Sequence, residues 1–523
     1  MLSYNFLKSR YARAAGFICI LLVAIFLFSQ PRFLHAADNL KKITILYTND
    51  THSRLLPFTQ AVTGKSVGGI ERRAAYISSV KKENPFTLVV DAGDLSQGTP
   101  FYNFFKGEAE FKAFALAGYD YLTLGNHELD YGMQNLKSQA RAAGLEFVCA
   151  NLFDSKTLKP LFTPFKIKNI GGVKIAVIGI MGKEAWDVVS NKYKEGVLYA
   201  GEFVLLKKIC ALLSDKVDLI VLLSHSGYQQ DIKLAAALPE IGVIIGSHTH
   251  TKMDKPLEVY TARPPLNKTI VTQAFENGVY MGRLDFYFDG GNRLPNYGSF
   301  YKLIDSSIRV NKKTPLRRHI QYYEDKMKDA VSIIIGESEI EMDNMADMFN
   351  SLDTPMGRYM CDALKEISGS DVFFTNTTTF RDRMPPGAIT IETLLKIVPF
   401  DNTVVVFEMS GAALLKMMNF IALNFGKNES FQYGGIAFTI DIDTRTAREV
   451  LVGGSPVDND KIYKVATSSY IAQGNLMGGE MFKEARSNYD TGTCLRDMLM
   501  EYIKKNPKIN APAGGRLKLI KVK

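Results

Sequence analysis

The sequence is poor in cysteine, tryptophan and histidine. The shortage of cysteine excludes some kinds of metal site and scaffold. Its 523 residues include five cysteines, one tryptophan and seven histidines. The cysteines have no close pairs in the sequence, which excludes a thiolate metal site and a disulfide-dense scaffold. There is no internal repeat and no low-complexity tract, and 46% hydrophobic with 22% charged residues is the composition of an ordinary globular protein. The length exceeds that of one compact core, so we expect two or three domains.

Long apolar runs are also missing, apart from one near the amino terminus. The first 16 residues hold three basic residues and no acidic one, and the nearly apolar run Phe17–Phe28 follows. Small residues then precede Asp38. This layout is typical of a secretory signal peptide, which we assign to residues 1–37 and which predicts a secreted or periplasmic protein. An uncleaved anchor is the alternative. The run is shorter than the roughly 20 residues of a membrane span, so we expect no stable span after cleavage.

The net positive charge does not indicate a nucleic-acid partner. The value of +9 owes much to the leader and to the basic tail between Lys504 and Lys523. A protein that binds nucleic acid usually carries a basic stripe interleaved with aromatic residues, and the sequence has none. We therefore expect a small-molecule substrate and no nucleic acid.

Short apolar runs alternate with helical patterns from residue 43 to about 275. Such runs, spaced by helices, indicate an α/β fold in which the sheet is buried on both faces. A second α/β pattern begins after Ile335, and the mostly polar stretch Thr314–Ser332 predicts a helix that connects the two domains. The runs of the first pattern are Ile43–Tyr47, Thr87–Val90, Tyr121–Leu124, Phe147–Ala150, Lys174–Ile180, Leu219–Leu223 and Val243–Ile245.

Polar segments follow five of these runs. Ligand sites in open α/β sheets form beyond the carboxyl ends of the strands, so all five segments can converge on one crevice. They contain five of the seven histidines. The segments are Asn49-Asp50-Thr51-His52, Asp91-Ala92-Gly93-Asp94, Gly125-Asn126-His127-Glu128-Leu129-Asp130, Ser224-His225-Ser226-Gly227 and Gly246-Ser247-His248-Thr249-His250.

These residue types suit a site with two metal ions. Imidazoles and carboxylates, without thiolates, are ligands for divalent zinc, manganese or iron. Two such ions, bridged by one carboxylate, hold the attacking and leaving oxygens of an in-line phosphoryl displacement and lower the pKa of a bound water. The segments therefore predict a two-metal phosphoesterase, and the leader predicts that it is secreted.

The five segments resemble the calcineurin-like metallophosphoesterase superfamily and, within it, the 5'-nucleotidase family, over residues 43 to about 515. The resemblance implies a four-layer α/β/β/α metallophosphoesterase domain at residues 41–305 and a connecting helix at 306–335. A smaller mixed α/β domain of the 5'-nucleotidase C-terminal type, which binds substrate, is then expected at 336–523.

The resemblance also implies roles for the polar residues. His127 matches the family's catalytic histidine, and Asp130 would orient it, since a spacing of three residues allows the pair to meet on one helical turn. The alternatives are that His127 is a further metal ligand and that Asp130 caps a turn. The implied metal ligands are Asp50, His52 and His250 for one ion, Asn126, His225 and His248 for the other, and Asp94 as the bridge.

In the second domain the resemblance implies a nucleotide-binding surface. Phe400 and Tyr470 match two aromatic residues that stack the base, while Asn376 and Arg381 match groups that contact the sugar and phosphate. Glu480 replaces an aspartate that the family usually has. Between Asn376 and Arg381 the family usually has glycines, whereas this chain has three threonines. Relatives often carry an arginine before the residues that match Met356-Gly357, whereas in this chain Arg358 follows them.

We therefore expect a metal-dependent phosphoric ester hydrolase that converts nucleoside monophosphates or related nucleotides to nucleoside and phosphate. A metal-bound hydroxide would attack the phosphorus in line. A 2',3'-cyclic nucleotide phosphodiesterase, a nucleotide-sugar hydrolase and a sulfur-oxidation hydrolase acting on a protein-bound thiosulfonate are alternatives with the same metal site. A catalytically inactive, secreted nucleotide-binding protein is the alternative of another class.

Overall fold

The structure is a computed structural model that describes most of the chain beyond the leader. The segment predicted to be a signal peptide, residues 1–37, lies outside the described residues. Among the residues that are described, no helix is both long and apolar enough to cross a bilayer. The described ranges are 40–59, 64–189, 191–260, 268–343, 353–400, 402–426, 431–474, 478–510 and 512–521.

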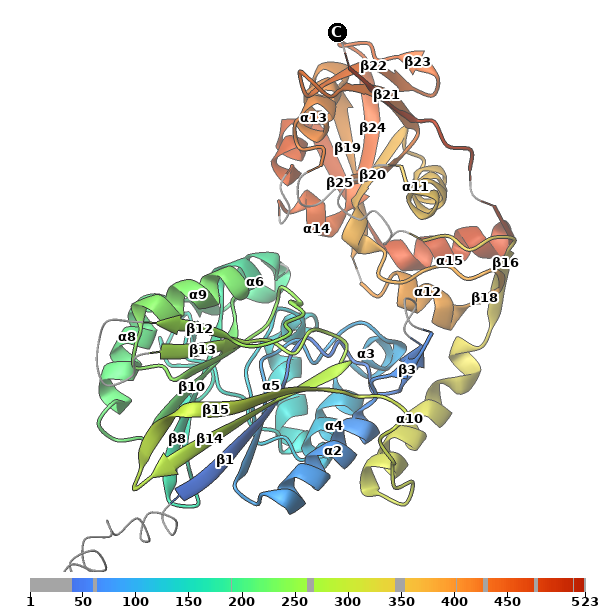
Figure 1. Cartoon of the computed structure of the whole chain (residues 1–523). Coiled ribbons are helices and arrows are strands. Elements are labelled where there is room, and N and C mark those ends of the chain that lie inside the picture. The colour runs from blue at the N-terminus through green and yellow to red at the C-terminus, as the bar shows by residue number, and fades with distance from the viewer. Residues whose placement is uncertain are drawn as a thin grey trace, which may run out of the picture.

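Two mixed sheets, packed face to face, form the amino-terminal half (Figure 1). Apolar residues of both sheets, such as Ile45, Val90 and Val221, share one buried cluster. The first sheet has the order β15 (Asn292–Leu303), β14 (Tyr280–Asp289), β1 (Leu40–Thr48), β4 (Thr87–Asp91) and β5 (Tyr121–Leu122). The second has the order β12 (Leu257–Tyr260), β13 (Lys268–Thr272), β11 (Val243–Gly246), β10 (Leu219–His225), β8 (Val173–Met181) and β7 (Phe165–Ile170).

Helices cover the outer face of each sheet (Figure 1). Apolar residues of α2 (Ile70–Glu83), α4 (Glu108–Ala117) and α5 (Gly132–Ala143) pack on the first sheet. Those of α8 (Glu202–Leu213) and α9 (Tyr228–Ala237) pack on the second. The result is a helix–sheet–sheet–helix sandwich, which confirms the predicted four-layer α/β fold.

Most of the predicted strands are present, but their division between two sheets was not readable from the apolar runs alone. The run Phe147–Ala150 forms only isolated bridges, from Phe147 to Leu122 and from Val148 to Thr163, instead of a strand. The long hairpin of β14 and β15 was missed because its outer strand has no fully buried residue and no continuous apolar run. Strand β14 pairs antiparallel with β1, so the hairpin extends the first sheet on that side.

The helix expected between Thr314 and Ser332 is α10 (Pro315–Val331). The Thr314 hydroxyl accepts a hydrogen bond from the backbone N–H of Arg317 and so caps the first turn. The apolar face of α10 packs on α4 and on α3 (Pro100–Phe105) of the amino-terminal half. The buried residues of this face are Leu316, Ile320, Tyr323, Met327 and Val331.

The carboxyl-terminal half is built on a third, five-stranded sheet. Its order is β20 (Phe431–Gly434), β17 (Val372–Asn376), β24 (Ile462–Ser468), β19 (Thr403–Ser410) and β25 (Ser487–Cys494). One face carries α11 (Pro355–Ser368) and α15 (Leu495–Lys505), and the other carries α13 (Gly411–Leu423). Smaller sheets flank it, with the orders β18 (Gly387–Thr390), β16 (Ile334–Ser338), β26 (Lys508–Ile509) and β23 (Ser455–Pro456), β22 (Thr446–Val452), β21 (Ile436–Asp441), β27 (Leu517–Ile520).

Candidate active site

The five polar segments meet in one cluster at the carboxyl ends of strands from both sheets of the amino-terminal half. The potential ligand atoms form three groups, and within each group the atoms lie within 4.8 Å of one another. The groups overlap because His52 and Asp94 each belong to two of them. The Nε2 atoms of His52 and His250 are 3.0 Å apart. The groups are Asp50–His52–His250, His52–Asp94–His127 and Asp94–His225–His248.

The backbone of the cluster is strained. Five of the seven predicted ligands have left-handed φ angles between 46° and 75°: Asp50, His52, Asp94, His248 and His250. A non-glycine residue in that region costs of the order of 1–3 kcal/mol, and such residues gather at functional sites. Hydrogen bonds between loops hold this conformation, from Asp50 N to Gly93 O at 2.9 Å and from His52 N to Asp94 O at 3.0 Å.

Two acidic residues that the sequence analysis did not select hold these loops in place. Glu128 is buried and accepts backbone N–H bonds from Asp94 at 2.9 Å, Ser96 at 3.0 Å and Gly125 at 2.6 Å. Glu276 accepts from His250 Nδ1 at 2.8 Å, which orients that imidazole. Glu276 follows β13 just as the predicted ligands follow their strands, and that placement was the available signal.

The donor set fits divalent ions. His52 Nδ1, Asn126 Oδ1 and His225 Nε2 are buried and have no hydrogen-bond partner, although Asp94 Oδ2 lies 3.3 Å from His225 Nε2. Burial lowers the pKa of His248 to about 3, so its lone pair is free at neutral pH. Burial alone would raise the pKa of the Asp94 carboxyl, but His225 and His127 hold it well below its ordinary value. A neutral imidazole at His248 and an ionised carboxylate at Asp94 are forms that bind metals.

Gly125 is required by the close packing of this cluster. A Cβ atom there would overlap Asp94 Oδ1 and lie 2.6 Å from His225 Cε1. We expect Gly125→Ala to displace Asp94 and to lower the rate of phosphate release by about 100-fold, because a displacement of about 1 Å has that effect in active sites. The matched control is Gly201→Ala, at a glycine whose Cβ would meet open space. Equal rates of phosphate release by the two variants would contradict the packing argument.

His127 lies between the cluster and the carboxyl-terminal half. Its Nδ1 is 2.9 Å from Asp130 Oδ2, and its backbone N–H donates to Asp94 Oδ1 at 3.0 Å. Burial would lower the pKa of His127, but Asp130 and Asp94 raise it above the ordinary value. The geometry is compatible with a proton donor held by Asp130, and it also places a His127 ring nitrogen within reach of His52 and Asp94, so the alternative role as a ligand stays open.

The carboxyl-terminal half brings an aromatic ring to this histidine. The rings of Phe400 and His127 stack with centroids 6.0 Å apart and an interplanar angle of 26°. The guanidinium carbon of Arg381 lies 5.5 Å from the centroid of Phe400. Asn103 Nδ2 of α3 donates to Pro399 O at 2.6 Å and so ties the Phe400 loop to the amino-terminal half.

Comparison with known proteins agrees with this architecture. Residues 43–252 match the calcineurin-like phosphoesterase family, and residues 334–484 match the C-terminal domain of 5'-nucleotidases. The chain belongs to the 5'-nucleotidase family. It is therefore a metal-dependent phosphoric ester hydrolase with the two-part architecture of that family.

Relatives of this family align with nearly the whole chain. A 5'-nucleotidase of Vibrio cholerae is 28% identical over 91% of this chain and 94% of its own length. The rat 5'-nucleotidase is also 28% identical, over 91% of this chain and 90% of its own. The structure of a 5'-nucleotidase precursor from Thermus thermophilus superposes with a TM-score of 0.79 at 26% identity, covering 92% of this chain and 99% of that one.

The remaining residues predicted from the family's substrate site have different surroundings. Asn376 is buried, its amide nitrogen donates to Thr378, and its Oδ1 accepts from Thr379 at 2.7 Å, so the threonine turn engages the whole side chain. Tyr470 is half-buried and interacts electrostatically with Arg381. Glu480 is exposed and accepts from Gly478 N at 3.0 Å.

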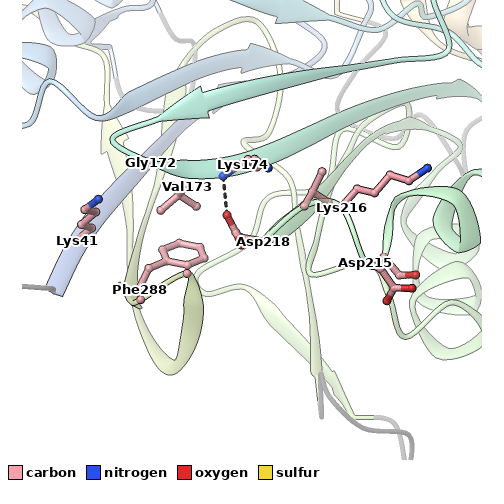
Figure 2. Close-up of a pocket in the computed structure, with 12 residues that line it drawn as sticks. Lys41, Gly172, Val173, Lys174, Asp215, Lys216, Asp218 and Phe288 are labelled. Atoms are coloured by element: carbon pink, nitrogen blue, oxygen red, sulfur yellow. Dashed lines mark hydrogen bonds between the residues drawn. The ribbon is translucent and has the colours of Figure 1, made fainter.

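A separate cavity of about 480 Å³ lies at the amino ends of β1, β8 and β10, the opposite end from the metal cluster. Figure 2 shows Asp218 accepting a hydrogen bond from the backbone of Lys174 at its wall. None of the predicted site residues lines it, so it plays no part in the phosphoesterase site.

Proposed function

We propose that this member of the 5'-nucleotidase family hydrolyses nucleoside monophosphates or closely related nucleotides and releases phosphate, with two divalent ions in the cluster. The observation that carries the proposal is the position of Asp94, which is shared by two of the overlapping ligand groups and is bonded to the His127 backbone. Each ion would have its own set of side chains: Asp50, His52 and His250 for one, Asn126, His225 and His248 for the other, and Asp94 for both.

The chemistry follows from what these groups do to a phosphate ester. Divalent ions, zinc or manganese for example, neutralise phosphoryl oxygens and lower the pKa of the attacking water. His127, protonated and held by Asp130, would donate a hydrogen bond or a proton to the leaving oxygen. Arg381 would place its planar donor fork against the phosphate or sugar. Phe400 and Tyr470 would receive the base, with Asn376 and Glu480 at the edge of the same surface.

The enzyme would act outside the cytoplasm, in a secreted or periplasmic location. The basic, apolar and small-residue order of residues 1–37 supports this location. An uncleaved leader would hold the same enzyme at a membrane. The two cases are distinguished by the mass of the protein purified after expression with its full leader, measured by mass spectrometry. Cleavage is expected to remove residues 1–37.

A phosphate-release screen on the full chain, loaded with manganese or zinc, tests the function. We expect release from adenosine monophosphate, and the panel includes cyclic nucleotides, nucleotide sugars and sugar phosphates. If the loaded chain bound adenosine monophosphate without releasing phosphate from any of these esters, it would be a binding protein and the hydrolase proposal would fail.

Phe400→Ala tests the aromatic stacking of the base. Stacking contributes about 1–3 kcal/mol per base, so we expect kcat/KM for adenosine monophosphate to fall by about 5- to 150-fold. Ribose 5-phosphate has no base, and its kcat/KM is expected to change little. Phe300→Ala, at an exposed ring on β15, is the matched control. Unchanged activity of the Phe400 variant toward adenosine monophosphate would favour a non-nucleotide substrate such as a thiosulfonate.

A further inference from the structure

Glu110 is a fully buried acid that has no part in the reaction proposed above. It lies in the first turn of α4, and its exposed fraction is 0%. Its Oε1 accepts a hydrogen bond from Ser53 Oγ at 2.5 Å, while its Oε2 has no hydrogen-bond partner among the described residues. In the same part of the chain no cationic side chain forms a salt bridge with it, and burial raises its pKa to about 7.

Burying a carboxyl group in this way destabilises the fold. An ionised carboxylate is expensive to remove from water without a paired cation, and a protonated one still leaves a polar oxygen unsatisfied. A methionine has a similar volume and would fill the space without that cost. Buried acids with a shifted pKa are concentrated at functional sites, and the side-chain hydrogen bond of Glu110 leads to Ser53.

Ser53 follows the predicted ligand His52 in a strained turn. The φ angle is 46° at His52 and 55° at Ser53, so two consecutive non-glycine residues have a left-handed backbone. Such a conformation is unfavourable and persists only where the surrounding structure holds it. The position of the His52 imidazole therefore depends on the groups that fix Ser53.

Ser53 is also bonded to the neighbouring loop of residues 94–99, which begins with the predicted bridging ligand. Its backbone N–H donates to Leu95 O at 2.8 Å. The hydroxyl oxygens of Ser53 and Thr99 are 2.6 Å apart, and Thr99 Oγ1 lies 3.1 Å from Ser53 O, to which it donates. The carboxyl group of Glu110 is thus bonded to the point where the two ligand loops meet.

The helix that carries Glu110 is held by its apolar face. Phe111 and Phe114 are buried in the core beside the first sheet. The ring of Phe111 packs against that of Phe147 with centroids 5.5 Å apart. Because α4 cannot shift without breaking this packing, Glu110 presents its carboxyl group to Ser53 from a fixed position.

We propose that Glu110 is a positioning residue of the metal site, which holds the His52 imidazole in place through its hydrogen bond to Ser53. The proposal rests on the two-ion site proposed above. Glu110 would touch neither ion, since it acts through the strained turn. Its loss should weaken binding of the ion assigned to His52 and spare the ion assigned to His225 and His248.

Calorimetric titration of the metal-free full chain with Mn²⁺ tests this role without relying on turnover. Glu110→Met removes the hydrogen-bond acceptor and keeps the volume, so it should weaken one of the two ions by about 10-fold, the lower end of the range for residues that orient metal ligands. Glu110→Gln keeps an oxygen that accepts from Ser53 and should restore the affinity to within about threefold of the wild type.

Ser53→Ala removes the donor of the same bond. It should weaken the same ion, and combining it with Glu110→Met should add little, because both changes remove one interaction. Glu108→Met is the matched control, since Glu108 is an exposed glutamate on the same helical turn and accepts from Tyr323 Oη instead. This variant should bind both ions as the wild type does.

Thermal unfolding separates positioning from general support of the fold. The Tm of metal-free Glu110→Met should stay within about 4 °C of the wild type, because the change removes a costly buried polar group. Equal weakening of both ions together with a much lower Tm would overturn the proposal, since Glu110 would then only stabilise the fold. Unchanged affinity for both ions, or no recovery in Glu110→Gln, would also overturn it.

The remaining outcomes distinguish this role from the proposed function. If the wild type bound a single Mn²⁺ ion, the two-ion function would fail, and weaker binding of that ion by Glu110→Met would leave the positioning role standing. If the wild type bound none, both would fail. If Glu110→Met does not fold, Ser53→Ala replaces it, and wild-type affinity in that variant would overturn the proposal.

Discussion

Replacing His127 with alanine is expected to lower kcat by about 10²- to 10⁴-fold, the usual contribution of a general acid or base. The metal content should stay near that of the wild type, because Asp50, His52, Asp94 and the other predicted ligands remain. The physical reason is the position of the ring, 2.9 Å from Asp130 and stacked on Phe400 at the border between the cluster and the substrate surface. Stopped assays of phosphate release, with elemental analysis of the same preparation, measure both quantities.

Two further variants separate a role of His127 in the reaction from a role as a metal ligand. Asp130→Asn should lower kcat by a smaller factor, because the imidazole stays in place but loses the carboxylate that raises its pKa. His319→Ala is the matched control, since that imidazole lies on α10 and bonds to Ala109 O at 2.9 Å, away from the cluster. Loss of metal together with activity in His127→Ala would show that the residue is a ligand, and unchanged turnover would remove it from the reaction.

Asp94→Asn is expected to have the second large effect, on both metal binding and turnover. The change keeps the shape of the side chain beside Gly125 and removes the charge that both ion positions share in our proposal. Metal ions contribute several kcal/mol to the transition state, so kcat should fall by about 10³-fold or more. We also expect fewer than two ions per chain by mass spectrometry of the metal content.

Chelation provides an independent measure for Asp94. Because a ligand that binds only the folded state stabilises it, removing divalent ions should lower the Tm of the wild type. The Tm of Asp94→Asn should respond much less. Asp187→Asn, at an exposed carboxylate paired with Lys183, should behave as the wild type does. If chelation shifted the wild type and Asp94→Asn by the same amount, Asp94 would have no place in the metal site.

The core of the site was predictable because its residues are concentrated in short segments after apolar strands. His225 and His248 could be predicted without knowing how the strands are arranged, because the carboxyl ends of strands in α/β proteins meet at one edge of the sheet. Glu276 was not selected. Its role depends on the contact with His250, and its place after β13 was the one local sign of that role.

The sequence alone determined the kind of chemistry, because imidazole and carboxylate types at strand ends already restrict the site to divalent ions. It also determined the second α/β unit and the helix Pro315–Val331, since apolar spacing reports which residues leave water. The tertiary structure decided which strands form each of the two packed sheets and that Phe400 of the carboxyl-terminal half stacks on His127. These features depend on contacts between residues far apart in the sequence, whose free energy exists only once the chain is folded.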